Sequence, residues 1–379
     1  MKVEDVVRAL ESIAPASYAE PWDKVGLHAG RFGAAVKGPL LLTIDLTEQV
    51  LSEAENRGAG MIIAYHPPIW EPLQQITDGT PRQRIILRAL EKGIAIYSPH
   101  TALDAVAGGM TDWLCEGLSG GTDGKIQGDC RAIIPHAQPV PTQKVKIVTF
   151  VPREDLDKVR NALASAGAGI IGNYSVCSFS TDGVGTFLGD AASSPRKGGK
   201  GKLEEIREVR LEMVCSKAAL ALAIETLRGF HPYETAPIDV HELMDQPVRS
   251  AGTGRRLLLD HPITVAALAE RLKKHINRPT VRLACANPKK KVSTIGVCPG
   301  SGGSILRAAA ADGCEVFVTG EMKHHDVMSA LDLGVGVILG EHTSTERGYL
   351  PRLAGKIEKA LPGARVVIAE SDVDPVAVV

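Results

Sequence analysis

Metal-ligand side chains follow three apolar stretches of this chain, each with the composition of a buried β-strand. The stretches are residues 60–70 (GMIIAYHPPIW), 93–104 (GIAIYSPHTALD) and 334–346 (GVGVILGEHTSTE), and they carry His66, His100, Asp104, His342 and Glu346. Because open α/β sheets bind ligands at the carboxyl ends of their strands, we expect the three groups to converge at one sheet edge. Imidazole and carboxylate together suit a divalent transition metal such as zinc, iron or manganese.

Each of these side chains also has an interpretation that involves no metal. His342 and Glu346 share a helix face at a spacing of four residues, but a carboxylate at a helix start also favours the helix dipole by itself. His66 is either a ligand or a buried structural histidine, and the two prolines after it give the strand a rigid exit. His100 is a ligand, a group that orients a ligand, or a side chain bonded to a backbone carbonyl. Asp104 is a direct ligand or the cap of the turn that follows it.

Residues 319–326 (TGEMKHHD) add polar side chains at the end of another predicted strand. Glu321 is a candidate for substrate contact or for proton transfer, together with His100. His324 and His325 either contribute to the same pocket or lie in solvent at the start of a helix.

Two turn motifs remain without an assigned role. Residues 298–304 (CPGSGGS) lie between a predicted strand and a predicted helix, where they either bind an anion with backbone N–H groups or form a plain tight turn. Residues 231–235 (HPYET) contain His231 and Glu234, which are either functional or part of a capped turn.

The composition is that of a globular protein of 379 residues, with 44% apolar and 23% charged residues. A formal net charge of −1 gives no electrostatic reason to expect nucleic acid or membrane as a partner. The seven cysteines are odd in number and include no Cys-x-x-Cys pair, which favours reduced thiols and argues against a thiolate zinc site. With no signal-peptide pattern and no long apolar run, the sequence predicts a cytoplasmic location.

The elements that must position these residues alternate as strands and helices in the first 118 residues, and again from about residue 264. This alternation predicts a mostly parallel α/β sheet covered on both faces. Residues 144–244 instead follow the order strand-helix-strand-strand-helix-strand, which predicts a ferredoxin-like α+β module. The chain is therefore expected to form a discontinuous α/β domain, from residues 1–130 and 260–379, with the module inserted.

Several long motifs, in order, carry a family resemblance that covers nearly the whole chain. They are residues 13–30 (IAPASYAEPWDKVGLHAG), 63–70 (IAYHPPIW), 96–114 (IYSPHTALDAVAGGMTDWL), 318–326 (VTGEMKHHD) and 340–348 (GEHTSTERG). With these motifs the chain resembles the Nif-three-like family, which consists of ring-forming dinuclear-metal proteins often labelled type-2 GTP cyclohydrolase I. The resemblance implies two divalent metal ions per subunit.

The family's metal-binding positions fall on Tyr65, His66, Asp104, His342 and Glu346. The departure is Tyr65, where many members have histidine. Tyrosine either ligates as a phenolate, because a nearby cation lowers its pKa, or leaves that position to water. This departure bears directly on the occupancy of the second metal site.

The inserted module, with residues 167–179 (GAGIIGNYSVCSF), resembles the PII/CutA-like insertion of some family members. In the family this insertion accompanies a toroidal homohexamer. The resemblance implies a metal-dependent hydrolase of a nucleotide-like or other heterocyclic substrate, with GTP as the candidate. The alternatives are a metal-binding or metal-delivery protein without turnover, and a regulatory scaffold whose module senses a small ligand.

Overall fold

The structure is a computed structural model that describes residues 1–138 and 140–376. It divides into two compact units: Met1–His136 together with the residues from Val248 onward, and Ala137–Pro247. The first unit is a mixed α/β domain built from two separate parts of the chain, and the second is inserted between them. The predicted fold class, a discontinuous α/β domain with an inserted α+β module, is confirmed.

One sheet of the first unit has continuous apolar strands. Its order is β1 (Gly26–Ala29), β4 (Ala95–Ser98), β3 (Met61–Ala64), β2 (Leu40–Thr43) and β15 (Val366–Ile368). Strands β4, β3, β2 and β15 run parallel, and β1 pairs antiparallel with β4. Every residue of β2, β3 and β4 is buried, as expected for parallel strands covered on both faces.

Helices cover both faces of this sheet. Side chains of α2 (Glu48–Asn56) and α3 (Pro81–Lys92) pack on one face, and those of α1 (Val3–Ile13) and α12 (Leu350–Ala360) on the other. The alternation of side chains along the strands separates the two cores. Leu41 and Ile62 face α2 and α3, whereas their strand neighbours face α1 and α12.

The second sheet of this unit has a parallel centre. Its order is β11 (Arg282–Ala284), β14 (Gly336–Leu339), β13 (Val316–Glu321), β12 (Lys291–Ser301), β10 (Gln246–Thr264) and β5 (Asp129–Gln138). Strands β12, β13 and β14 are parallel, while β11 and β10 join them antiparallel.

The helices around the second sheet are α5 (Met110–Ser119), α8 (Val265–His275), α9 (Leu306–Ala311) and α10 (His324–Asp332). Two short helices, α4 (His100–Ala105) and α11 (Ser344–Arg347), follow β4 and β14, and 3-10 turns occupy Ala16–Tyr18 and Gly303–Ile305. One apolar core contains side chains from both sheets, so the two sheets belong to one packed body.

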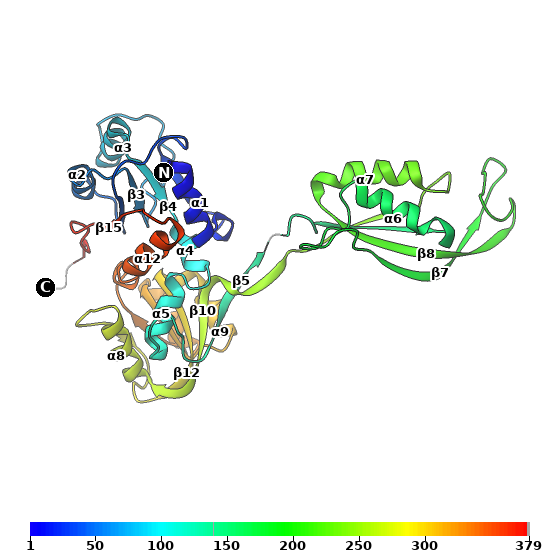
Figure 1. The fold of residues 1–379 in the computed structure, drawn as a ribbon. Helices are drawn as coiled ribbons and strands as arrows, with labels where there is room; N and C mark the ends of the chain where they lie inside the picture. Colours follow the sequence, from blue (N-terminus) through cyan, green and yellow to red (C-terminus); the bar gives the residue numbers. More distant parts are fainter. Residues whose placement is uncertain (139, 377–379) are drawn as a thin grey trace. The chain divides into compact units, whose positions relative to one another are not determined.

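The inserted unit has the predicted ferredoxin-like order. Its elements are β6 (Val145–Val151), a 3-10 turn (Arg153–Asp155), α6 (Leu156–Ser165), β7 (Phe179–Leu188), β8 (Leu203–Cys215), α7 (Lys217–Phe230) and β9 (Ile238–Glu242). The antiparallel sheet has the order β7-β8-β6-β9. Figure 1 shows α6 and α7 on the same side of this sheet, where they bury the unit's own apolar core.

None of the helices in residues 1–138 and 140–376 is both long and apolar enough to cross a lipid bilayer.

A buried arginine holds β10 to the helices that follow β4. Arg255 is 1% exposed, and its Nε donates to Oδ1 of Asp112 at 2.6 Å. Its two terminal nitrogens donate to backbone carbonyls, including those of Gly252 (2.8 Å) and Ala105 (2.9 Å). A buried charge is tolerated only when it is paired and hydrogen-bonded. Arg255 has both an ion-pair partner and hydrogen-bond acceptors.

We predict that Arg255→Met destabilises the first unit by about 3 kcal/mol, because Asp112 would remain as a charge without its partner. Urea unfolding followed by tryptophan fluorescence measures this unit specifically, because Trp22, Trp70 and Trp113 all lie in it.

The matched control is Arg256→Met, since Arg256 is less buried and its Nε donates to the carbonyl of Asp312. Its effect should be under about 1 kcal/mol. Equal unfolding midpoints for the two variants would contradict the role given to Arg255.

Candidate metal centre

Three of the predicted ligands form a compact cluster. One donor atom each from His66, His342 and Glu346 lies within 4.8 Å of the other two. The Nε2 atom of His66 is 3.5 Å from Oε2 of Glu346, and the Nε2 atom of His342 is 3.4 Å from Oε1. The carboxylate is 2% exposed, whereas the two imidazoles are partly open to solvent.

The cluster joins the ends of two different sheets. His66 follows β3 of the first sheet, and His342 follows β14 of the second. The expectation of a single sheet edge was therefore wrong. The strand-end rule still applies to each sheet separately, but the packing of the two sheets is what brings the ends together.

The side chains present fit a divalent transition metal. The Oε2 atom of Glu346 is buried and has no hydrogen-bond partner among the described residues, a state that costs free energy unless a cation compensates it. Gly300, with φ +57°, leaves open the space next to the cluster. A Cβ at this position would lie 2.6 Å from Oε1 of Glu346 and 3.1 Å from Nε2 of His342. Two imidazoles and a carboxylate are donors that zinc, iron and manganese accept.

A carboxylate fixes each histidine of the centre from behind. The Nδ1 contacts are His66 with Asp45 (2.8 Å), His342 with Glu321 (3.0 Å) and His100 with Asp23 (2.6 Å). Because a carboxylate only accepts hydrogen bonds, each Nδ1 carries a proton, and Nε2 is the atom left to bind a metal. Burial would raise the pKa of Asp45, but the hydrogen bond from His66 and the charge of Arg347 hold it below its ordinary value.

The remaining two predicted ligands, Tyr65 and Asp104, contact each other. The Tyr65 hydroxyl donates to Oδ1 of Asp104 at 2.6 Å. Burial, with the neighbouring charges of Asp104 and Glu346, raises the pKa of Tyr65 well above its usual value, so the phenol is neutral here. Burial also raises the pKa of Asp104 to about 7, although the hydrogen bond from Tyr65 opposes this. A cation beside the pair would favour the charged form of both.

His100 lies beside the cluster. It begins α4 with φ +27°, a strained value for a residue other than glycine. Asp23 holds it there, because it also accepts a hydrogen bond from the backbone N–H of Thr101 at 3.0 Å. The His100 ring lies edge-on to Tyr65 and His66, with centroid distances of 5.4 and 5.6 Å. Its Nδ1 partner is thus a carboxylate and not a backbone carbonyl.

Sequence reasoning missed two of the three carboxylates that orient the histidines, Asp45 and Asp23. Asp45 follows a fourth apolar strand, β2, and this strand-end position was the available signal. Asp23 lies in the stretch 13–30, which carried the family resemblance but had no independent functional account.

The histidines at 324 and 325 and the CPGSGGS motif lie outside the three-residue cluster. His324 and His325 are exposed at the start of α10 and are not members of the three-residue cluster. In the CPGSGGS motif the backbone N–H of Gly300 donates to Oγ1 of Thr345 at 2.9 Å. The motif therefore packs against the helix that carries Glu346.

We predict that metal affinity increases steeply with pH. Burial lowers the pKa of His66, whereas the hydrogen bond to Asp45 and the nearby Glu346 carboxylate raise it, to about 10. Below that pH a metal must displace the proton, so binding tightens by up to tenfold per pH unit. Zinc titrations against a competing chelator should give a Kd at least tenfold lower at pH 8 than at pH 6. A pH-independent Kd, after correction for the chelator, would contradict this.

We also predict that Glu346→Gln weakens zinc binding by about a hundredfold or more, because loss of a direct ligand exceeds the effect of losing an orienting group. Metal content after dialysis and far-UV circular dichroism measure binding and folding separately.

The control for this variant is Glu341→Gln, since Glu341 instead pairs with Arg282 at 3.0 Å. It should retain the zinc affinity of the wild type. Equal metal content in the two variants would exclude Glu346 as a ligand.

Known proteins match this chain over nearly its whole length. The family described as Duf34/NIF3 (NGG1p interacting factor 3) matches residues 1–375. NIF3-like protein 1 of Rattus norvegicus is 34% identical over 389 residues, covering 100% of this chain and 93% of the relative. A Bacillus subtilis (strain 168) protein named GTP cyclohydrolase 1 type 2 homolog is 31% identical, covering 98% and 97%. The crystal structure of Staphylococcus aureus protein SA1388 matches with a TM-score of 0.78 at 26% identity, covering 100% and 99%.

Proposed function

Because the chain belongs to the DUF34/NIF3 family, we propose that it is a divalent-metal protein whose centre hydrolyses a nucleotide-like or other heterocyclic substrate. The observation that carries the proposal is Glu346, a buried carboxylate with an unpartnered oxygen that faces two imidazoles. Such an arrangement needs a cation to offset the cost of burying the charge.

In this proposal His66, His342 and Glu346 hold one ion. Asp104 and Tyr65 would help to hold a second. A divalent ion supplies Lewis acidity, which lowers the pKa of water and polarises the group under attack. The chain's own part is to hold Nδ1 of each imidazole on a carboxylate, Asp45 or Glu321, so that Nε2 is the nitrogen directed at Glu346.

His100 and Glu321 are the proposed proton carriers. His100 is fixed by Asp23, so its free Nε2 can accept a proton while Nδ1 keeps its own. Glu321 is half-exposed and lies against Nδ1 of His342 at 3.0 Å, where it both orients that ring and can pass a proton to solvent.

A cavity of about 970 Å³ beside the centre supports a substrate of nucleotide size. Its walls include His66 and Asp45 from the centre and Arg82 from the start of α3. GTP is the candidate that the name of the Bacillus subtilis relative suggests.

A second candidate is metal binding or delivery without turnover. It is favoured by the hydrogen bond between Tyr65 and Asp104, which occupies two of the proposed ligands with each other. A centre with fewer ligands would exchange its ion more readily. Slow loss of metal to a chelator would count against delivery.

We further propose that the chain acts as a homohexamer in the cytoplasm, as the family resemblance implies. Light scattering coupled to size-exclusion chromatography should give a mass about six times that of the chain. A monomer or dimer at micromolar concentration would contradict the ring assembly.

The test of turnover uses the full chain reconstituted separately with zinc, manganese and iron(II). We predict that GTP is consumed with release of formate, and that His342→Ala lowers the rate by about a hundredfold or more because it removes a ligand.

The matched control is His324→Ala, which removes an exposed histidine outside the cluster and should leave turnover unchanged. Confirmed metal loading without any GTP turnover would overturn the hydrolase proposal and favour metal binding or delivery.

A further inference from the structure

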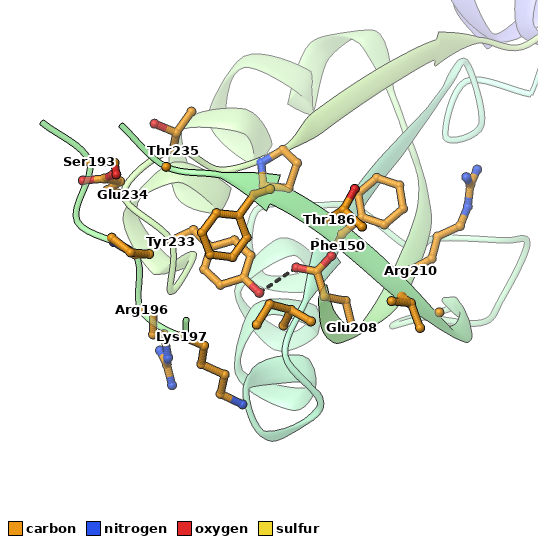
Figure 2. Close-up of a pocket in the computed structure, with 18 of the residues that line it drawn as sticks. Phe150, Thr186, Ser193, Arg196, Lys197, Glu208, Arg210, Tyr233, Glu234 and Thr235 are labelled. Carbon is orange, nitrogen blue, oxygen red and sulfur yellow. Dashed lines mark hydrogen bonds between the residues drawn. The ribbon is translucent and has the colours of Figure 1, made fainter. Parts of the chain in front are cut away.

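The inserted unit contains a second cavity, of about 680 Å³, which the metal centre does not use. All of its lining residues belong to this unit, and the HPYET motif forms part of the wall (Figure 2). The volume lies within the range that accommodates a small-molecule ligand.

The floor of the cavity is the sheet face opposite α6 and α7. Along β8, Val209 and Leu211 are buried in the core beneath the helices, so Ile206, Glu208 and Arg210 project to the other face. Two glycines of β7 keep this face open. At Gly185 a Cβ would lie 2.1 Å from Oε2 of Glu208, and at Gly183 it would meet no atom within 4 Å.

Tyr233 fixes a carboxylate inside the cavity. Its hydroxyl donates to Oε1 of Glu208 at 2.6 Å, the hydrogen bond drawn in Figure 2. Burial and this carboxylate raise the pKa of Tyr233, so the phenol stays a donor. Glu208 has no salt bridge to a cation among the described residues. It is thus a rigid anionic acceptor among aromatic side chains.

His231 supports the position of Tyr233. It is buried, its Nε2 contacts the carbonyl of Phe150 at 3.1 Å, and its Nδ1 accepts from the backbone N–H of Tyr233 at 3.2 Å. The carboxylate of Glu234 accepts from the backbone N–H of Ser194 at 2.8 Å. The capped-turn interpretation of the motif therefore describes His231, whereas Glu234 holds the loop at Ser194, and Tyr233 lines the cavity.

Cationic side chains lie on both sides of the Tyr233–Glu208 pair. Figure 2 shows Arg196 and Lys197 there, with Phe150 and Arg210 on the opposite side. Arg196 pairs with Asp155 at 2.8 Å and Lys197 with Glu154 at 2.5 Å, and both cations are partly exposed. An anionic group of a ligand would share these cations with their present partners.

We propose that this cavity is a second ligand site that takes a guanine nucleotide. Phe187, on β7, lines the cavity together with Tyr233. The rings of these two residues accept a planar base, and Glu208 accepts hydrogen bonds from its N–H groups. Guanine presents two neighbouring N–H donors that one carboxylate can accept together, which adenine does not. Arg196 and Lys197 bind the phosphate.

The test is isothermal titration of the full chain, in the presence of EDTA, with guanosine and adenosine 5′-monophosphates. The guanine nucleotide should bind at least tenfold more tightly than the adenine nucleotide. Glu208→Gln should reduce this preference to threefold or less. Gly183→Phe, which places a ring in the open space above β7, should abolish binding of both.

Two control variants locate the site. Glu205→Gln changes an exposed carboxylate on the same strand that does not line the cavity, and it should bind as the wild type does. His342→Ala removes a residue of the metal centre and should also bind normally. Far-UV circular dichroism of each variant reports whether it folds.

Three results would overturn the proposal. The first is the absence of guanine nucleotide binding at millimolar concentration. The second is binding that disappears in His342→Ala but persists in Gly183→Phe, which would assign it to the metal centre. The third is equal affinity for guanosine and adenosine 5′-monophosphates, or a preference that Glu208→Gln leaves unchanged.

Discussion

The buried carboxylate of Glu346 is the constraint on which the rest of the centre depends. At 2% exposure it loses most of its hydration, and one of its oxygens has no hydrogen bond among the described residues. Such a group is stable only if positive charge approaches it closely. His66 and His342 face this carboxylate, and a side chain at Gly300 would enter the same space.

The orientation of the histidines extends this constraint outwards. Each imidazole presents Nδ1 to a carboxylate, so an acidic residue stands behind His66, His342 and His100. The arrangement sets which nitrogen is free and how tightly a proton competes for it. The centre spans both halves of the first unit. The strands that carry its residues come from chain segments on either side of the insertion and share one apolar core, and the buried Arg255 lies in the same unit.

The inserted unit follows different physical rules, because its sheet has helices on one face only. The buried residues of β8 alternate with more exposed ones, and the unit has a core of its own. The uncovered face is where glycines, an oriented carboxylate and aromatic rings surround a cavity. Because the inserted unit has its own core, it can bind a ligand by itself. The metal cluster includes none of the residues that line this cavity.

The sequence by itself determined the alternation of the central strands and helices, the discontinuous α/β domain and the strand ends that carry His66, His342 and Glu346, because these follow from local periodicity and chain order. It could not place Asp45 or Asp23 behind the histidines, nor pair Tyr65 with Asp104. Those contacts join residues 21 to 77 positions apart, and only side-chain packing selects them. The sequence also suggested a single sheet edge, whereas the structure has two sheets. A pattern of strands does not specify which sheet each strand joins. Tertiary packing decided these points because burial, and not sequence spacing, sets which polar groups must find partners.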